Sequence, residues 1–307
     1  MANRHETVLL HEAITSLVGS PGGFYVDGTY GRGGHSRCLL EQINEHGRVL
    51  ACDKDGAAED SALQLQEADT RFSFLRTSFA DIPEYLAAQT KQADGILLDL
   101  GVSSPQLDQA ERGFSFQSDG PLDMRMDQSG GMTAAEWLAV VDQEQLEQVL
   151  RDYGEERFAR RIARAILEAR DRQPVARTAQ LAEIVKAAHP RWEPGKHPAT
   201  RAFQAIRIAI NRELDDLKEF LGKALAALAI GGRLVVISFH SLEDRLVKRQ
   251  FREWSKGPSL PKDIPLRAQD YQSKARILGK PVRPSAAELE RNIRARSAIM
   301  RSAMRLA

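Results

Sequence analysis

Short apolar runs alternate with amphipathic segments over the first hundred residues of the chain. Strands are predicted at 24–26, 48–52, 72–75 and 94–100, and helices at 6–19, 37–43, 57–68 and directly after Asp81. The run at 94–100 is almost continuously apolar, which is typical of a parallel strand covered on both faces. Strands that alternate with helices in this way predict an α/β fold with a doubly wound, Rossmann-like sheet.

The alternation stops after residue 108, and residues 111–131 are rich in Gly, Ser and Asp. Helical patterns follow at 133–151, 155–171 and 177–189, then one long helix at 200–228, a strand at 232–238 and a terminal pair of strands at 277–282 and 297–304. The stretch 255–275 is predicted to be low-complexity or flexible. We therefore predict a sheet domain of residues 1–108 and 200–307, with residues 109–199 as an inserted helical domain.

A glycine-dense turn separates the first predicted strand from its helix. The turn reads Asp-Gly-Thr-Tyr-Gly-Arg-Gly-Gly-His-Ser at 27–36, and Gly31, Gly33 and Gly34 would let the backbone approach a ligand closely. Asp53 ends the second strand twenty residues after Gly33, where a carboxylate is placed to accept both hydroxyls of a ribose. A glycine-rich turn without a ligand is the alternative, and the strand context together with Asp53 favours a nucleoside-type ligand.

Two details of this turn disfavour a dinucleotide. Asp27 precedes the glycines, and an anion there repels a pyrophosphate but attracts a cationic amino group. Ser36 stands where the third glycine of the dinucleotide fingerprint belongs. ATP is disfavoured because no Gly-Lys-Ser or Gly-Lys-Thr follows the loop. A ligand with a ribose, an ammonium and no phosphate fits these residues, and S-adenosylmethionine has those properties.

Further candidate residues follow later strands. Asp99 comes near the end of the apolar run at 94–100, and Ser-Ser-Pro-Gln follows at 103–106. Ligands of doubly wound sheets bind at the carboxyl ends of the strands, so we expect Asp99 and this loop to lie beside the glycine turn. Phe79 follows the third strand, where its ring is placed either against an adenine or in the hydrophobic core.

Charge is distributed unevenly along a chain of ordinary globular composition. The 307 residues carry a net charge of +1. Residues 157–172 contain six Arg against two acids, and residues 271–307 contain nine Lys or Arg against two acids. These regions predict either an anion-binding surface or solvated helix faces.

The remaining composition excludes several classes of protein. Cys38 and Cys52 form neither a metal-ligand spacing nor a disulfide framework, and we predict no metal site. The first residues have no signal-peptide pattern, and no apolar run has membrane-spanning length. We therefore expect a cytoplasmic protein that makes no membrane contact.

Seven short blocks carry a more specific pattern. They are the turn at 27–36, Asp-Leu-Gly-Val-Ser-Ser-Pro-Gln-Leu-Asp at 99–108, Arg-Gly-Phe-Ser-Phe at 112–116, Pro-Leu-Asp-Met-Arg-Met at 121–126, Tyr-Gly-Glu-Glu-Arg at 153–157, His-Pro-Ala-Thr-Arg at 197–201 and Ile-Ser-Phe-His-Ser-Leu-Glu-Asp-Arg at 237–245. In this order they closely resemble the bacterial MraW/RsmH family of small-subunit ribosomal RNA cytosine-N4 methyltransferases, and the resemblance covers essentially the whole chain.

The resemblance implies a class I S-adenosylmethionine-dependent methyltransferase fold with a helical insertion. It implies methyl transfer to the exocyclic N4 amine of a cytosine in the decoding region of 16S rRNA. It places the cofactor residues on Gly33, Gly34, His35, Asp53, Phe79, Asp99 and Gln106. His35 and Gln106 enter through the resemblance alone, because the chemistry of the turn had not selected them.

The chemistry of the methyl-accepting amine indicates further candidate residues. The lone pair of a cytosine N4 is delocalised into the ring, so the site needs hydrogen-bond acceptors around the amine. Our hypothesis is that Asp99, Ser103 and Ser104 frame the amine; the alternative is that Asp99 contacts only the cofactor. The loop at 103–106 departs from the Asn/Ser-Pro-Pro-aromatic tetrad of amino-methyltransferases, which leaves the accepting atom open. His240 is expected to face the site, either in catalysis or base contact or as a loop-stabilising histidine.

The acceptor base must be unpaired or flipped out of its stack to reach the methyl group. Aromatic rings are predicted to stack on it, and nearby polar or basic residues to contact the substrate. The candidates are Phe114, Phe116, Asp123, Arg125, Arg201 and Arg207. The two last arginines are expected either to hold phosphates or to face solvent. The expected partner is 16S rRNA in an assembled or late-assembling small subunit, with RNA recognition assigned to the helical insertion; the oligomeric state is left open, with a homodimer as one alternative.

Other functions stay open from sequence alone. One alternative is a methyltransferase for a non-RNA amine. It would have the same cofactor-binding residues but would not need the basic regions. A non-catalytic ribosome-assembly factor could retain the cofactor pocket without turnover. An NAD oxidoreductase is a third alternative, which Asp27 disfavours. Cofactor titration and the RNA dependence of methyl transfer separate these alternatives.

Overall fold

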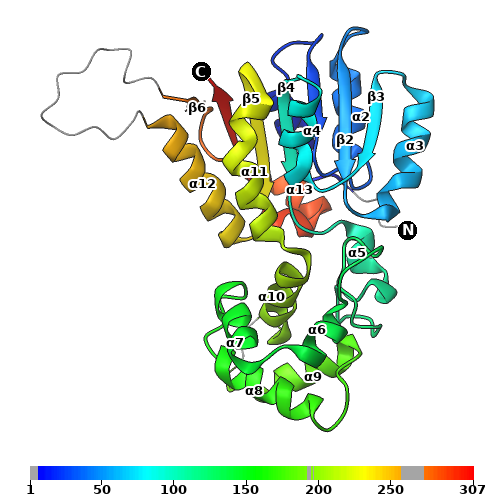
Figure 1. Ribbon diagram of the computed structural model, residues 1–307, viewed down its shortest axis with the longest axis vertical. Helices are drawn as coiled ribbons and strands as arrows, with labels where there is room; N and C mark the ends of the chain where they lie inside the picture. The colour runs from blue at the N-terminus through cyan, green and yellow to red at the C-terminus, as the bar shows by residue number, and fades with distance from the viewer. Residues whose placement is uncertain (1–5, 192–194, 196, 257–272) are drawn as a thin grey trace, which may run out of the picture. The chain divides into compact units, whose positions relative to one another are not determined.

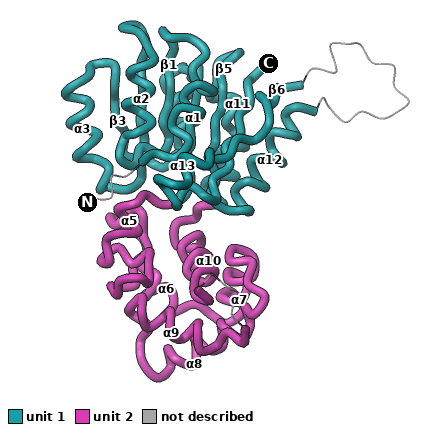
Figure 2. Tube along the Cα trace, turned by 180° about the vertical axis from the view of Figure 1, so that it is seen from behind, with its two compact units in different colours: residues 1–101, 214–307 teal, residues 102–213 magenta. Residues whose placement is uncertain are grey.

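The computed structural model describes residues 6–191, 195, 197–256 and 273–307. The chain divides into two compact units, one of residues 1–101 with 214–307 and one of residues 102–213 (Figure 2). The boundaries predicted from the sequence are 108 and 200. The second boundary differs because helix α10 (Ala199–Asn211) buries its apolar face in the core of the helical unit.

Among the described residues, the first unit contains a seven-stranded sheet in the order β3-β2-β1-β4-β5-β7-β6 (Figure 1). The strands are β1 (Phe24–Asp27), β2 (Arg48–Asp53), β3 (Phe72–Arg76), β4 (Ala93–Asp99), β5 (Leu228–Ser238), β6 (Ala275–Ile277) and β7 (Ile299–Arg305). Strands β1 to β5 pair in parallel, and β7 is antiparallel to both β5 and β6. The strand order reverses between β1 and β4, so their carboxyl ends form the switch point where such sheets bind ligands.

Helices cover both faces of this sheet. One face carries α1 (Leu10–Leu17), α2 (Gly34–Gln42) and α3 (Glu59–Ala68), and the other carries α4 (Ile82–Ala88), α11 (Glu213–Ala227) and α12 (Ser241–Ser255). Alternate strand residues enter the two cores: Leu97 faces the first, whereas Ile96 and Leu98 face the second. The predicted doubly wound, Rossmann-like sheet is confirmed.

The second unit is helical. Its helices are α5 (Ser104–Asp108), α6 (Ala134–Val140), α7 (Gln143–Asp152), α8 (Ala159–Arg170), α9 (Thr178–Ala188) and α10. They enclose one apolar core, which includes Leu146, Ile162, Leu181 and Ile206. Shorter elements of the chain are α13 (Ala286–Arg291) and the 3-10 turns Gly56–Ala58, Phe79–Asp81, Ala110–Arg112 and Ile293–Ser297.

Some predicted elements were wrong in extent. The single helix expected at 200–228 is two helices, because Arg212 adopts the left-handed conformation at φ +52° between α10 and α11. The helix expected at 133–151 is likewise divided, since Asp142 caps α7 by accepting a 2.8 Å hydrogen bond from the backbone N–H of Gln145. The strand expected at 277–282 is reduced to β6 and an isolated bridge between Val282 and Met300. Most of the stretch 255–275 lies outside the described residues.

No helix in the described part of the chain combines the length and the apolar character needed to cross a bilayer.

Candidate active site

The glycine turn after β1 packs too tightly for larger residues. Gly33 precedes α2 at φ +74°, and a Cβ at this position would lie 2.5 Å from the ring of Tyr30. A Cβ on Gly34 would lie 1.9 Å from Oγ1 of Thr7. Both distances are far below van der Waals contact, so the packing of this unit requires these glycines whatever ligand it binds. Their contact with a cofactor stays a prediction.

Asp27 is fully buried at the end of β1. Its Oδ2 accepts a 2.6 Å hydrogen bond from the hydroxyl of Ser36, and its Oδ1 accepts one of 3.2 Å from the backbone N–H of Thr29. Burial raises the pKa of Asp27 to about 6, against the opposing effect of these two hydrogen bonds. The carboxyl group therefore fastens the turn to the first residues of α2, and its direct contact with a ligand stays a prediction.

Asp53 ends β2 and supports the same turn. Its Oδ2 accepts a 2.7 Å hydrogen bond from the backbone N–H of Gly31, and its Oδ1 accepts one of 2.9 Å from the backbone N–H of Asp55. Burial is the largest influence on this group and raises its pKa. A carboxylate oxygen has more than one lone pair, so both oxygens retain capacity to accept from a diol such as a ribose.

Phe79 is half-buried after β3, and its ring meets that of Phe220 edge to face, with centroids 5.9 Å apart. Helix α11, which carries Phe220, also carries Asp216, and this acid contacts both Lys54 and Ser78. Asp216 could not be predicted from the sequence, because its two contacts span 162 and 138 residues and leave no local pattern.

Asp99 ends β4 with 23% of its side chain exposed. Its backbone N–H donates a 2.6 Å hydrogen bond to Oγ1 of Thr29, which joins β4 to the glycine turn. Its Oδ2 lies 3.8 Å from Nδ1 of His35, and its Oδ1 has no hydrogen-bond partner among the described residues. Burial raises the pKa of Asp99 well above its usual range, and the charges of Asp27 and Glu243 raise it further. The structure thus brings Asp99, His35 and the turn together.

His240 follows β5 as the N-cap of α12. Its Nδ1 accepts a long hydrogen bond of 3.5 Å from the backbone N–H of Glu243, and its Nε2 lies 3.1 Å from Oε1 of the same residue. Oε2 of Glu243 accepts a 2.9 Å hydrogen bond from the backbone N–H of Phe239. These contacts hold His240 at the start of α12 and are compatible with a loop-stabilising histidine, and its role in catalysis or base contact stays a prediction.

Carboxyl groups dominate the electrostatics of this region. The charge of Asp53 contributes to the raised pKa of Asp27. The charges of Asp27 and Glu243 contribute to the raised pKa of Asp99. Negative charge in a partly desolvated site favours a cationic ligand. Asp53 supplies acceptors for a diol, Phe79 supplies a ring, and Asp99 supplies a carboxylate oxygen that has no partner in the described part of the chain. These residues fit S-adenosylmethionine, which carries a ribose, an ammonium and a sulfonium.

The candidate residues after position 101 belong to the second unit. Ser103 and Gln106 form a capping box at the start of α5, where Oε1 of Gln106 accepts a 2.8 Å hydrogen bond from the backbone N–H of Ser103. Gln106 is buried, and Ser104 is half-buried as the first residue of the helix. The capping box shapes this loop, while the contacts predicted for the three residues stay predictions.

Phe114 and Phe116 already have partners inside the second unit. Phe114 is buried, and the guanidinium carbon of Arg112 lies 5.7 Å from the centre of its ring. The ring of Phe116 lies 4.6 Å from that of His197 and 4.9 Å from that of Phe203, measured between centroids. Stacking on a base stays a prediction for both rings, and it requires them to give up part of these contacts.

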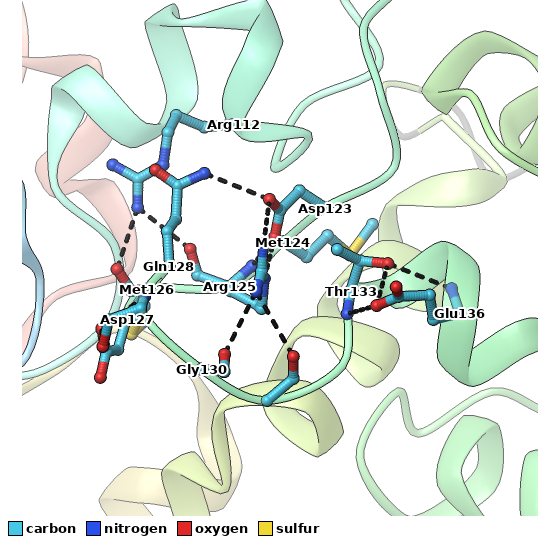
Figure 3. Close-up of polar contacts among 12 residues, drawn as sticks. Arg112, Asp123, Met124, Arg125, Met126, Asp127, Gln128, Gly130, Thr133 and Glu136 are labelled. Atoms are coloured by element: carbon cyan, nitrogen blue, oxygen red, sulfur yellow. Dashed lines mark hydrogen bonds and ion pairs between the residues drawn. The ribbon is translucent and has the colours of Figure 1, made fainter.

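The segment 121–131 is built around an ion pair (Figure 3). Arg125 donates from Nε and Nη2 to the two carboxylate oxygens of Asp123 at 2.7 and 3.0 Å. Burial raises the pKa of Asp123, but the hydrogen bonds from Arg125 outweigh it, so the pKa is lowered overall. Arg112 donates from Nη2 to the carbonyl oxygens of Arg125 and Met126 at 3.0 and 3.1 Å. The two candidate substrate residues therefore hold each other in a fixed loop.

Asn211 holds the same segment from α10. Its Nδ2 donates to the carbonyl oxygen of Met124 at 2.7 Å, and its Oδ1 accepts from the backbone N–H of Met126 at 2.7 Å. Met124 has φ +62°, a left-handed conformation that is uncommon outside glycine and persists only where surrounding contacts enforce it. Asn211 could not be predicted from the sequence, because these two partners lie more than 80 residues earlier in the chain.

The two candidate phosphate contacts lie on α10. Arg207 donates from Nε and Nη2 to the two carboxylate oxygens of Glu213, both at 2.8 Å, and the pair is mostly buried. A phosphate at Arg207 would have to displace this carboxylate. Arg201 is half-buried on the same helix, and its contact with RNA stays a prediction.

The strand order, the turn after β1 and the acids that end β2 and β4 together define a class I S-adenosylmethionine-dependent methyltransferase. The family model of the MraW methylase family matches residues 2–306. The chain belongs to that family.

Individual relatives are similar in sequence to this chain over nearly their whole lengths. Ribosomal RNA small subunit methyltransferase H of Nitrosococcus oceani is 53% identical over 302 residues, which are 97% of this chain and 96% of that protein. The protein of the same name from Nitrosospira multiformis is 54% identical over 312 residues, with 99% and 98% covered. Among solved structures, an rRNA methylase from Streptococcus thermophilus is 10% identical with a TM-score of 0.41, and the match covers 96% of this chain and 92% of that one.

Proposed function

We propose that this protein transfers the methyl group of S-adenosylmethionine to the exocyclic N4 amine of a cytosine in the decoding region of 16S rRNA. Family membership and relatives named as small-subunit ribosomal RNA methyltransferases support the RNA substrate. We place the reaction in the cytoplasm, on an assembled or late-assembling small subunit.

The observation that carries the proposal is the environment of Asp99. Its carboxyl group ends β4 beside the glycine turn and has one oxygen without a hydrogen-bond partner among the described residues. We propose that this oxygen accepts a hydrogen bond from the N4 amine, which localises the nitrogen lone pair and stabilises positive charge as it develops. S-adenosylmethionine supplies, when bound, a methyl group that its sulfonium already activates.

The remaining chemistry is positioning and proton transfer. When bound, the cofactor would give its methyl group to N4 and leave as a neutral thioether that keeps the S–CH₃ electron pair, and the amine would lose one proton. Asp99 is the proposed acceptor of that proton, because its raised pKa makes it a stronger base than an ordinary aspartate. Asp53 and Phe79 are the proposed ribose and adenine contacts, and alignment by these residues supplies much of the rate.

Ser103 and Ser104 follow Asp99 by four and five residues, and we propose that they complete the frame around the amine. The loop at 121–131, with its Asp123–Arg125 pair, is the proposed substrate loop. The helical unit is the proposed RNA-recognition unit, with the arginines of α8 on the phosphate backbone.

The test uses methyl-labelled S-adenosylmethionine, the purified protein and small ribosomal subunits that lack the modification. The RNA is then digested, and the labelled nucleoside is identified by chromatography and mass spectrometry. Label in N4-methylcytidine is the expected result, and a parallel reaction on naked 16S rRNA shows which form is the substrate. Tight cofactor binding without label in RNA would move the assignment to a non-RNA amine or to a non-catalytic assembly factor.

A further inference from the structure

A half-open pocket lies at the far edge of the sheet, between α12 and the strands β6 and β7. Among the described residues, its apolar lining is formed by Phe251, Ile277, Leu278 and Pro281. Phe251 is buried, whereas Ile277 is 41% exposed. Figure 1 and Figure 2 both show α12 beside β6. A concave apolar surface with an exposed isoleucine is suited to a ring or a sugar.

Positive side chains surround this apolar wall. Lys248 and Arg252 come from α12, and Lys280 comes from the segment after β6. None of these three side chains makes an ion pair or hydrogen bond with any other residue that the structure describes. Arg301 also lines the pocket, but Asp244 neutralises it by accepting hydrogen bonds of 2.7 and 3.1 Å.

The pocket is separate from the candidate active site. In the strand order, β6 stands four strands from β1, which at the usual spacing is about 19 Å. None of its lining residues belongs to the turn, the strand-end acids or the helical unit. It is therefore placed to bind a part of the substrate other than the reacting base.

We propose that this pocket binds the sugar-phosphate backbone of the RNA substrate at nucleotides remote from the acceptor cytosine. Arg252, Lys248 and Lys280 neutralise phosphates, and one ribose or unstacked base lies on Ile277 and Pro281. Charge complementarity selects RNA, because three cations without a counter-charge among the described residues surround an apolar wall and match a polyanion that also presents rings. The inference rests on the proposed function and adds a second point of attachment for the substrate.

The test is a double substitution, Arg252→Gln/Lys280→Gln, compared with a control of equal charge, Lys91→Gln/Arg249→Gln. Arg249 is exposed on the same helix outside the pocket, and Lys91 is exposed before β4. Binding of naked 16S rRNA is measured over a range of salt concentrations. The plot of log affinity against log salt should become shallower by about 1.4 for the pocket variant, since each lost contact to single-stranded RNA removes about 0.7.

A second readout separates docking from folding and from catalysis. The pocket variant should keep the wild-type affinity for S-adenosylmethionine and the wild-type kcat on small subunits, and only KM for the subunit should rise. Equal salt slopes for the two variants would overturn the inference while leaving the proposed function intact. Loss of subunit binding with unchanged naked-RNA binding would also overturn it, in favour of a protein partner. Failure of the wild-type protein to methylate RNA would overturn the proposed function and this inference together.

Discussion

Nζ of Lys54 lies 3.1 Å from Oδ2 of Asp216, and the same oxygen accepts a 3.2 Å hydrogen bond from Oγ of Ser78. Lys54 directly follows Asp53, and Ser78 directly precedes Phe79. One carboxylate oxygen on α11 therefore joins the two loops that carry the proposed ribose and adenine contacts. The side chains of Lys54 and Asp216 are only 20% and 14% exposed, so water screens this pair less than it screens a surface ion pair.

Asp216→Asn is expected to weaken cofactor binding, because both loops lose their charged anchor. A loss of about 1 kcal/mol corresponds to a rise of roughly fivefold in the dissociation constant for S-adenosylmethionine, measured by calorimetry. The kcat at saturating cofactor should stay unchanged. The matched control is Asp215→Asn, an exposed neighbour paired with Lys218, which should leave the constant unaltered. Equal effects of the two substitutions would show that Asp216 does not specifically support cofactor binding.

Asp99→Asn tests the proposed proton acceptor. The substitution keeps the size of the side chain but removes its basicity, so the rate of methyl transfer should fall by about 10²- to 10⁴-fold at saturating cofactor. Single-turnover transfer to small subunits measures this rate directly. If Asp99 contacted only the cofactor, the affinity for S-adenosylmethionine would fall and the saturated rate would be retained.

Asp27 gives the fold a pH dependence of defined sign. Its pKa is raised from 3.8 to about 6 by burial, so the folded state binds a proton more tightly than the unfolded chain does. The stabilisation is complete below pH 3.8 and is lost as pH rises through 6, by about 3 kcal/mol at most for a shift of this size.

Urea unfolding of the wild type and of Asp27→Asn at several pH values measures this contribution. Asn keeps one acceptor oxygen and replaces the other by a donor NH2 group, which changes stability equally at every pH, but it does not titrate. The stability of the variant relative to the wild type should therefore increase between pH 4 and pH 7. A difference that is independent of pH would contradict the assignment.

Gly34→Ala is expected to destabilise the protein, since the new methyl group would lie 1.9 Å from Oγ1 of Thr7 and 3.0 Å from its Cβ. Overpacking of this kind costs about 1–3 kcal/mol and lowers Tm in thermal unfolding. Gly222→Ala in α11 is the control, because nothing lies within 4 Å of its added Cβ. The control should instead stabilise by about 1 kcal/mol through helix propensity. A wild-type Tm for Gly34→Ala would show that the turn has room for a side chain.

Asn211→Ala tests the clamp on the proposed substrate loop. The substitution removes both 2.7 Å hydrogen bonds that hold Met124 and Met126, so we expect a loss of about 2 kcal/mol of stability. KM for the small subunit should rise because the loop with Asp123 loses its fixed conformation. Gln128→Ala, which removes one exposed hydrogen bond to Asp123, is the control and should change stability by less than about 0.5 kcal/mol. Equal KM values for the two variants would show that the conformation of this loop does not affect substrate binding.

Local sequence patterns were sufficient to predict the sheet and the position of the candidate site on it. Strands β1 to β4 and the helices between them follow apolar periodicities that depend only on neighbouring residues. Asp53 and Asp99 could be placed at one edge of the sheet because the carboxyl ends of parallel strands meet there. The glycines of the turn were recognised, but their packing against Tyr30 and Thr7 was not, since Thr7 lies outside the motif.

The chain by itself therefore determined the fold class, the order of its elements and which acids end its strands, because each depends on period and sequence neighbourhood. Only the tertiary structure decided where long helices break and which partners the side chains find. Gly222 is the only glycine at 200–228 and the segment has no proline, yet the helix runs through Gly222 and breaks at Arg212. The break is held by contacts of Arg207 with Glu213 and of Asn211 with the loop at 121–131. Such contacts join residues that meet only after the chain has folded, and they override local helix propensity.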